Sequence, residues 1–228
     1  MTVDTMSKEN KSNEYIEKNL ESTIQDDENV YFGSTYLNEK RFISYYYQFK
    51  EIIKSSPESV LEIGPGNKII SFILKNKNIK VITLDIDKRL DPEILADVNF
   101  LPLDSDSFDL VSCCEVLEHI PFENFRKSLS ELKGISKSKV IISLPDAEKY
   151  FKFSFQLPNL YEYKRLIKIP FQSFEKPNKE ENTHYWEINK KGYPLKKIKN
   201  EIREVGFEIE KTYRPFENPK HRFFILKN

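Results

Sequence analysis

The stretch Val60-Leu-Glu-Ile-Gly-Pro-Gly66 decides the fold of this chain: an apolar run ends in an acidic residue and a turn that holds two of the six glycines of the sequence. Glycine lets a backbone turn steeply and approach a ligand closely. A second apolar run, Ile79 to Leu84, is followed by another carboxylate, Asp85. Parallel strands that end side by side in this way bind nucleotide-like ligands beyond their carboxyl ends. The sequence therefore predicts such a site at the ends of its first two strands.

Apolar runs and helix-like segments alternate along the chain after this turn. We expect strands at 59–63, 79–84, 108–114 and 139–144, a short segment at 94–98, and helices near 67–77 and 122–132. A helix at 195–204 and two strands near 207–213 and 222–226 follow. This alternation predicts parallel crossovers and hence a Rossmann-like, doubly wound α/β fold with a mainly parallel sheet. The closely spaced last two strands predict an antiparallel pair at its edge.

The segments around this core predict one domain with extensions. Residues 1–28 are polar and predict a mobile tail, and residues 29–228 predict a single domain. Its parts are an amphipathic helix at 36–54, the core at 58–145, an insertion at 147–187, and a C-terminal helix and strand pair at 193–228. The first helix is expected to pack on the sheet, with a lid over the ligand as the alternative. The insertion, rich in aromatic and basic residues, is expected to be a helical cap after the fifth strand that also forms the substrate pocket.

Composition excludes several other classes of protein. Lysine plus arginine and aspartate plus glutamate number 36 each, so the net charge gives no reason to expect a nucleic-acid partner. Cys113 and Cys114 are adjacent in an apolar run and would point to opposite faces of a strand, which argues against a disulfide and for a reducing compartment. The first residues are charged where a signal peptide needs an apolar core, and no apolar stretch approaches the ~20 residues of a membrane span. We therefore expect a cytoplasmic protein.

The residues around the glycine turn narrow the ligand. A dinucleotide fingerprint needs a third glycine at position 69, which is isoleucine here. Glu62 directly precedes the turn, where it would crowd a pyrophosphate but would suit a hydroxyl or amino group. Asp85 stands where such folds bind ribose hydroxyls, whereas Asp87 is expected to cap a helix. Asp97 can accept a hydrogen bond from an exocyclic amine and Val98 can contact a ring, so the ligand is expected to be of the adenosine type.

In this order and spacing the motifs resemble those of the class I S-adenosylmethionine-dependent methyltransferases. The residues that carry the resemblance are Val60–Gly66, Leu84–Asp87, Asp97 with Leu101 and Pro102, Ser107–Asp109 and Glu115–Ile120. The resemblance implies a seven-stranded sheet with an antiparallel C-terminal strand, S-adenosylmethionine as cofactor and S-adenosylhomocysteine as product. It implies a cofactor site made of Glu62, Gly64, Pro65, Gly66, Asp85, Ile86, Asp97, Val98 and Glu115. In that site the glycine turn would face the methionine part, Asp85 the ribose, and Asp97 with Val98 the adenine.

One position departs from the family pattern. Lys68 stands where the family usually has glycine. Its ammonium group would either meet the carboxylate of the cofactor or obstruct the site.

The motif Glu115-Val-Leu-Glu-His119 follows the fourth strand, where the resemblance places the methyl group of the cofactor. Helical spacing brings Glu115, Glu118 and His119 together. His119 is the candidate catalytic residue, because an ordinary histidine pKa of about 6.5 suits a general base near neutral pH, with packing as the alternative. No metal is assigned, and a divalent ion is not favoured. If one is used, its ligands would be Glu115, Glu118, His119 and His184, as in the similar metal-assisted methyltransferases that act on RNA 3′ ends and on quinone-precursor phenols.

The resemblance implies transfer of a methyl group from S-adenosylmethionine to a small or medium-sized acceptor, either a small molecule or a lipid- or sugar-linked compound. An oxygen nucleophile is favoured because Glu115, Glu118 and His119 can accept its proton. His184, Tyr185 and Trp186 of the insertion are candidate substrate-binding residues. A metal-assisted RNA 2′-O-methyltransferase and a non-catalytic relative that binds a cofactor or a partner are the alternatives. The sequence predicts no oligomeric state.

Overall fold

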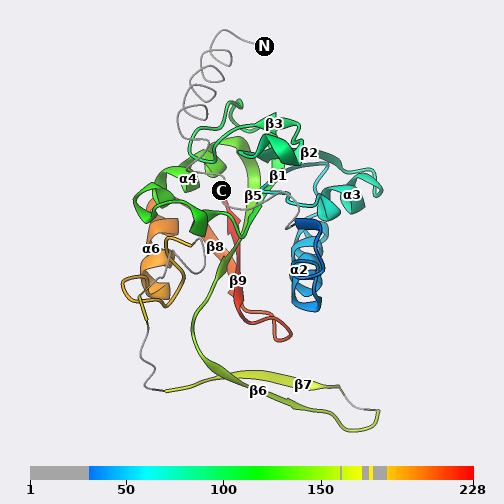
Figure 1. Ribbon diagram of the computed structural model, residues 1–228, viewed down its shortest axis with the longest axis vertical. Helices are drawn as coiled ribbons and strands as arrows, with labels where there is room; N and C mark the ends of the chain where they lie inside the picture. The colour runs from blue at the N-terminus through cyan, green and yellow to red at the C-terminus, as the bar shows by residue number, and fades with distance from the viewer. Residues whose placement is uncertain (1–30, 160, 171–174, 177–183) are drawn as a thin grey trace.

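The computed structural model describes residues 31–159, 161–170, 175–176 and 184–228 of the chain (Figure 1). The predicted tail, residues 1–28, lies outside these ranges. Within them, no helix combines the length and the apolar character that crossing a bilayer requires.

A seven-stranded sheet with the strand order β3-β2-β1-β4-β5-β9-β8 forms the centre of the fold. Its strands are β1 (Ser59–Ile63), β2 (Lys80–Asp85), β3 (Ile94–Leu95), β4 (Phe108–Cys114), β5 (Ser136–Pro145), β8 (Glu208–Tyr213) and β9 (His221–Lys227). The strands from β3 to β5 pair in parallel, whereas β9 runs antiparallel to both β5 and β8. The predicted doubly wound, mainly parallel sheet with an antiparallel C-terminal strand is therefore confirmed.

Helices cover both faces of this sheet, with α2 and α3 on one side and α4 and α6 on the other (Figure 1). Their bounds are α2 (Glu39–Lys54), α3 (Ile69–Lys75), α4 (Phe122–Ile135) and α6 (Leu195–Glu204), and two short 3₁₀ helices are η2 (Lys88–Leu90) and η3 (Leu117–His119). Because side chains alternate along a strand, Val60 of β1 packs in one apolar cluster with Ile52 of α2. Leu61 packs in a second cluster with Leu129 of α4. Burial on both faces explains why the central strands read as continuous apolar runs.

The order of the strands reverses at β1. Strand β2 lies on one side of β1 and β4 on the other. After β1 the chain therefore moves toward one edge of the sheet, and after β4 it moves toward the other edge. Open α/β sheets hold their ligands in the crevice that this reversal creates beyond the carboxyl ends of the strands. The turn after β1, Gly64 to Gly66, lies at this point.

Within its described residues, the insertion forms strands and not the predicted helical cap. Its described part contains β6 (Tyr150–Phe155) and β7 (Tyr163–Lys168), which form a separate two-stranded antiparallel ribbon. Figure 1 shows the ribbon reaching across one end of the molecule, away from the sheet. The predicted helical cap is wrong for the ribbon, whose residues form strands and are mostly exposed. The physical reason is a period of two: aromatic residues alternate with polar ones from residue 151 to 155, which suits a strand and not a helix.

Backbone hydrogen bonds hold the two ends of the insertion together. The N–H of Ile188 donates to the carbonyl oxygen of Pro145 at 3.0 Å, and the N–H of Ala147 donates to the carbonyl oxygen of Ile188 at 2.9 Å. The side-chain amide of Asn189 donates to Asp146 at 2.9 Å. The chain therefore leaves β5 and returns to the core at nearly the same place.

Trp186 fixes the returning chain in the core. Its side chain is fully buried, and its ring lies 4.8 Å from that of Phe125 and 5.0 Å from that of Phe122, between centroids. Its indole N–H donates to the carbonyl oxygen of Ile120 at 3.1 Å. An aromatic side chain in this position contributes to stability and not to a binding surface.

Replacing Trp186 by alanine is expected to lower the free energy of unfolding by about 3–5 kcal/mol, because the change leaves a large cavity among aromatic side chains. Urea denaturation followed by circular dichroism measures the loss. Trp186→Phe keeps most of the packing and is expected to cost less. An alanine variant as stable as the parent would show that this side chain is not part of the core.

Candidate functional site

A cavity of about 720 Å³ opens at the carboxyl ends of β1, β2, β4 and β5. This volume lies in the range that small-molecule sites usually have. Seven of the nine predicted cofactor residues line it: Glu62, Gly64, Pro65, Gly66, Asp85, Ile86 and Glu115. Other parts of its wall come from α2, the segment after β4, the end of β5 and the residues that follow it, and the segments around residues 31–36, 184–190 and 220–223.

Glycine is required at two positions of the turn after β1. Gly64 and Gly66 have left-handed φ values of 69° and 52°. A β-carbon at Gly64 would overlap the side chain of Val116, and one at Gly66 would lie 3.1 Å from the ring of Tyr31. The rings of Tyr31 and Tyr36 meet edge to face, 5.1 Å apart between centroids. Both rings lie in the cavity wall, so the segment from Tyr31 to Tyr36, which precedes α2, covers the turn. The C-terminal end of α2 packs on the sheet through Ile52.

The carboxylate of Glu62 is buried at the bottom of the cavity. Its oxygens accept hydrogen bonds from the amide of Gln48 at 3.3 Å and from the hydroxyl of Ser71. The same amide donates to Ser112 of β4 at 3.1 Å. Burial raises the pKa of Glu62 to about 7, against the lowering effect of these donors. The group is therefore poised between its neutral and charged forms, and a donor on a ligand would favour the charged form.

Asp85 lies at the end of β2, as predicted. Burial raises its pKa to about 6, although the N–H of Asp87 donates to it at 3.0 Å. Asp87 itself accepts from the N–H of Arg89 at 2.9 Å and caps η2, which confirms the predicted cap. Asp85 and Ile86 thus form the side of the cavity next to β2.

The two predicted adenine contacts are not in the cavity wall. Asp97 is buried and accepts from the backbone N–H of Asn99 at 2.7 Å and from its side-chain amide at 2.8 Å. Asn99 in turn accepts from Ser128 of α4 at 2.7 Å. Val98 lies in the apolar core. These residues hold the loop after β3 onto α4.

Lys68 neither enters nor blocks the cavity. Its ammonium group donates to the carbonyl oxygen of Asp91 and lies 3.5 Å from the carboxylate of the same residue. Its backbone has a φ of 59°, in the left-handed region that suits glycine. Glycine, which the resemblance implies at this position, would adopt this conformation without strain, and the left-handed turn delays the start of α3 to Ile69, two residues later than predicted.

Glu115 binds a histidine that the sequence motifs do not indicate. Its carboxylate accepts from Ser143 of β5 at 2.8 Å and lies 3.3 Å from Nε2 of His221, on β9. The other ring nitrogen of His221 lies 2.9 Å from the hydroxyl of Ser44. Burial lowers the pKa of His221, whereas the charge of Glu115 raises it. No motif of the sequence points to His221, which is one of three histidines in the chain, and in the structure all three line the cavity.

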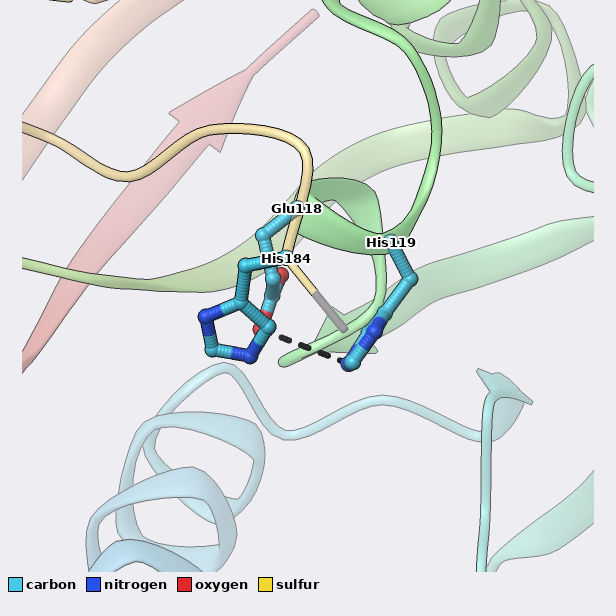
Figure 2. A group of neighbouring side chains, drawn as sticks. All are labelled: Glu118, His119 and His184. Carbon is cyan, nitrogen blue, oxygen red and sulfur yellow. Dashed lines mark ion pairs between the residues drawn. The ribbon is translucent and has the colours of Figure 1, made fainter. Parts of the chain in front are cut away.

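Glu118, His119 and His184 meet at the edge of the cavity (Figure 2). One potential ligand atom from each lies within 4.8 Å of the others. The two imidazole rings are 4.9 Å apart at an angle of 79°, and Nε2 of His119 lies 4.0 Å from Glu118. Nδ1 of His184 lies 3.1 Å from the carboxylate of Glu187, which orients the ring. Glu115, the fourth conditional metal ligand, is not part of this group.

Glu118 is an acid of the site that is buried away from water. Its side chain is fully buried, and neither oxygen has a hydrogen-bond partner within the described ranges. Burial, together with the nearby charge of Glu115, holds its pKa well above the ordinary value. A buried polar group without a partner is costly, and such groups often mark places where a ligand or ion completes the bonding.

Of the three candidate substrate-binding residues, only His184 lines the cavity. Tyr185 donates its backbone N–H to the carbonyl oxygen of Glu118 at 2.9 Å, and its side chain packs against the core. Trp186 is a core residue, as described above. The sequence showed three adjacent ring-bearing residues but not which face of the chain each would occupy.

Comparison with known proteins agrees with the geometry. Residues 61–144 match the family model described as methyltransferase domain. The match covers β1 to β5 and thus the part of the cavity built from Glu62, Asp85 and Glu115. The resemblance seen in the sequence is confirmed for this core.

An uncharacterized protein of Methanocaldococcus jannaschii is 36% identical over 87 residues, which are 35% of this chain and 36% of the relative. The chain thus spans about a third of the length of the curated relative that it matches. Among solved structures, the PH0226 protein of Pyrococcus horikoshii OT3 superposes with a TM-score of 0.58 at 13% identity, covering 89% of this chain and 99% of its own. A SAM-dependent methyltransferase from Archaeoglobus fulgidus gives 0.55 at 15% identity, covering 86% and 98%. At these identities the structures establish the shared fold.

The buried Glu62 predicts a pH dependence of stability. Because its pKa rises from the ordinary 4.5 to about 7 on folding, the folded state prefers the protonated form, and this carboxyl destabilises the protein increasingly as the pH rises from 4.5 to about 7. Glu62→Gln is therefore expected to stabilise the ligand-free protein more at pH 8 than at pH 5, by about 2 kcal/mol. Urea unfolding at the two pH values measures the difference. Glu58→Gln, at an exposed position, is the control, and an equal effect of both substitutions would contradict the assignment.

Proposed function

We propose that this chain is an S-adenosylmethionine-dependent methyltransferase that works in the cavity at the carboxyl ends of β1, β2, β4 and β5. The observation that carries the proposal is the position of this cavity in the segment that matches the methyltransferase family. Acidic acceptors and left-handed glycines line it where the strand order reverses.

The residues present fit the cofactor. Glu62 and Asp85 offer carboxylate oxygens to amino and hydroxyl groups, and the turn Gly64 to Gly66 lets a ligand come close to the backbone. Lys68 points to Asp91 and leaves this turn free. When bound, the cofactor supplies an electrophilic methyl group, and the chain has to orient it and the acceptor. Asp97 and Val98 lie behind the wall and would act by holding the loop after β3.

The proposed acceptor carries a hydroxyl group. The end of the cavity beyond β4 and β5 combines Glu115, Glu118 and His119 with His184 and Glu187. An alcohol or phenol must lose a proton when its oxygen is methylated, and these side chains can accept it. His119 is the proposed general base: its Nε2 lies 4.0 Å from Glu118, and an imidazolium formed there would favour ionisation of this buried carboxyl, which would offset the new positive charge. The proposed acceptor class is a small molecule or a lipid- or sugar-linked compound.

A metal-assisted form of the same transfer is the second candidate. It is favoured by the unpartnered oxygens of Glu118 and by the contact of Glu187 with Nδ1 of His184, which leaves Nε2 available as a ligand. Two imidazoles and one carboxylate suit a divalent transition ion. A nucleic-acid acceptor, such as an RNA 3′ end, has no support from the equal numbers of basic and acidic residues.

Asp85→Asn is expected to weaken the binding of S-adenosylmethionine and of S-adenosylhomocysteine about 10-fold or more, because the ribose would lose a charged acceptor. Isothermal titration calorimetry measures both constants. Asp106→Asn, in the exposed turn before β4, is the matched control. If neither compound binds the unmodified chain, the non-catalytic relative replaces the enzyme as the best interpretation.

When the chain is incubated with methyl-labelled S-adenosylmethionine and a panel of alcohols, phenols, amines and carbon acids, the label is expected on an oxygen atom of the acceptor.

His119→Ala is expected to lower kcat by about 10²–10⁴-fold while cofactor affinity stays the same, because the proton of the acceptor loses its base. Tyr185→Phe, next to His184 but outside the cavity wall, is the control. Activity that EDTA abolishes and a divalent ion restores would favour the metal-assisted form. Transfer to nitrogen or carbon alone would overturn the proposed acceptor.

A further inference from the structure

The ribbon formed by β6 and β7 has two unlike faces. Directly paired residues of an antiparallel ribbon share a face, and so do residues two apart on one strand. The pairs of the outer face are Phe151 with Ile167, Phe153 with Arg165, and Phe155 with Tyr163. The pairs of the inner face are Tyr150 with Lys168, Lys152 with Leu166, and Ser154 with Lys164.

The inner face binds the body of the protein through its charges. Lys164 lies 3.0 Å from the carboxylate of Glu217, and Lys152 donates to the carbonyl oxygen of the same residue at 2.9 Å. Lys168 lies 2.5 Å from Glu148. The guanidinium of Arg214 lies 4.6 Å from the centre of the Tyr150 ring. The cations of this face are therefore already paired.

The outer face is apolar and exposed. Its side chains Phe151, Phe153, Phe155, Tyr163 and Ile167 are between 46% and 63% exposed. Leu157 and Tyr161, in the connection between the strands, are 46% and 95% exposed. A solvated ribbon ordinarily turns its apolar side chains to the body, whereas this ribbon leaves five of them exposed on one face. Exposed apolar side chains gathered in this way mark an interaction site.

We propose that this outer face is a dimer interface, which packs against the same face of a second copy of this chain. A half-exposed side chain of this size offers on the order of 100 Å² of surface, so seven of them in each of two copies would bury roughly 1,400 Å². A specific, stable interface buries about 1,200–2,000 Å². A lone two-stranded ribbon is of marginal stability in water, and a second ribbon on its apolar face would supply the missing layer.

The arrangement of the face supports a second copy as its partner. A two-fold axis brings each residue of a surface against its own copy or its neighbours, so such a surface has to complement itself. The central pair of the outer face joins an aromatic ring, Phe153, to a cation, Arg165. An axis through this pair would place Arg165 of each copy over Phe153 of the other, in a cation–π contact. An anionic membrane is a weaker fit, because Arg165 is the only cation among the paired residues of this face.

The interface would bear on the cavity, because the ribbon starts at its wall. Glu148, Lys149 and Tyr150 all line the cavity, and Arg214 pairs with Glu148 at 3.1 Å beside the Tyr150 ring. A dimer would therefore fix the segment that closes one side of the site. The interface does not depend on the proposed function, and its test measures mass and not activity.

Sedimentation equilibrium of the full chain, from about 1 to about 100 µM, measures association directly. The expected result is a species of twice the chain mass of 27.1 kDa. Phe153→Asp is expected to weaken the dimer about 100-fold or more, because one substitution removes an aromatic contact on both sides of the axis. Phe72→Asp is the matched control, since Phe72 is 69% exposed on α3, far from the ribbon in sequence, and should leave the dimer intact.

Circular dichroism and thermal melting establish that both variants are folded. A parent chain with the mass of one copy at every concentration would overturn the proposal, and so would a Phe153→Asp dimer as strong as the parent. Co-sedimentation with vesicles of phosphatidylcholine and phosphatidylglycerol tests whether the face binds a membrane instead. If a monomeric parent sediments with them and Phe153→Asp does not, the face binds lipid and the dimer is wrong.

Discussion

The contact between the loop after β1 and the loop after β4 is the constraint on which the rest of this site depends. Position 64 must be glycine, because any β-carbon there would overlap Val116. The two loops can meet only because both adopt left-handed backbone, with φ values of 69° at Gly64 and 55° at Glu115. For a residue other than glycine this conformation costs about 1–2 kcal/mol. Ser143 and His221 hold the side chain of Glu115 and help to offset that cost.

That contact also gathers acids around one cavity. Burial raises the pKa of Glu62, Asp85 and Glu118 alike, so without a ligand these carboxyls keep their protons to a higher pH than exposed carboxyls do. A ligand with positive charge favours the ionised forms, and its binding would release protons. The electrostatics of the cavity therefore suit a cationic cofactor better than a phosphate-bearing one. This agrees with the inference drawn from Glu62 and from the missing third glycine of a dinucleotide fingerprint.

The sequence predicted the sheet well because buried parallel strands and amphipathic helices have strong local patterns. Helix α6 has its predicted bounds, Leu195–Glu204. The insertion was misjudged because its abundant aromatic residues suggested burial, whereas their alternation with lysine and serine specifies strands. Within the site, the motif around Glu62 identified local neighbours correctly. His221 was missed and Trp186 was misassigned, because contacts between segments distant in the sequence decide which side chains reach a cavity and which fill the core.

The backbone hydrogen bond between Ile188 and Pro145 separates the insertion from the rest of the fold. The excursion between these residues is closed by the hydrogen bonds at its ends, and β9 pairs with β5 whatever lies between. Doubling the length of a flexible loop costs only about 0.6 kcal/mol of closure entropy. The segment can therefore lengthen, shorten or be exchanged while the part of the cavity built from β1, β2 and β4 stays intact. Under the proposed function, selection can change the acceptor side of the cavity independently of the residues that would hold the methyl donor.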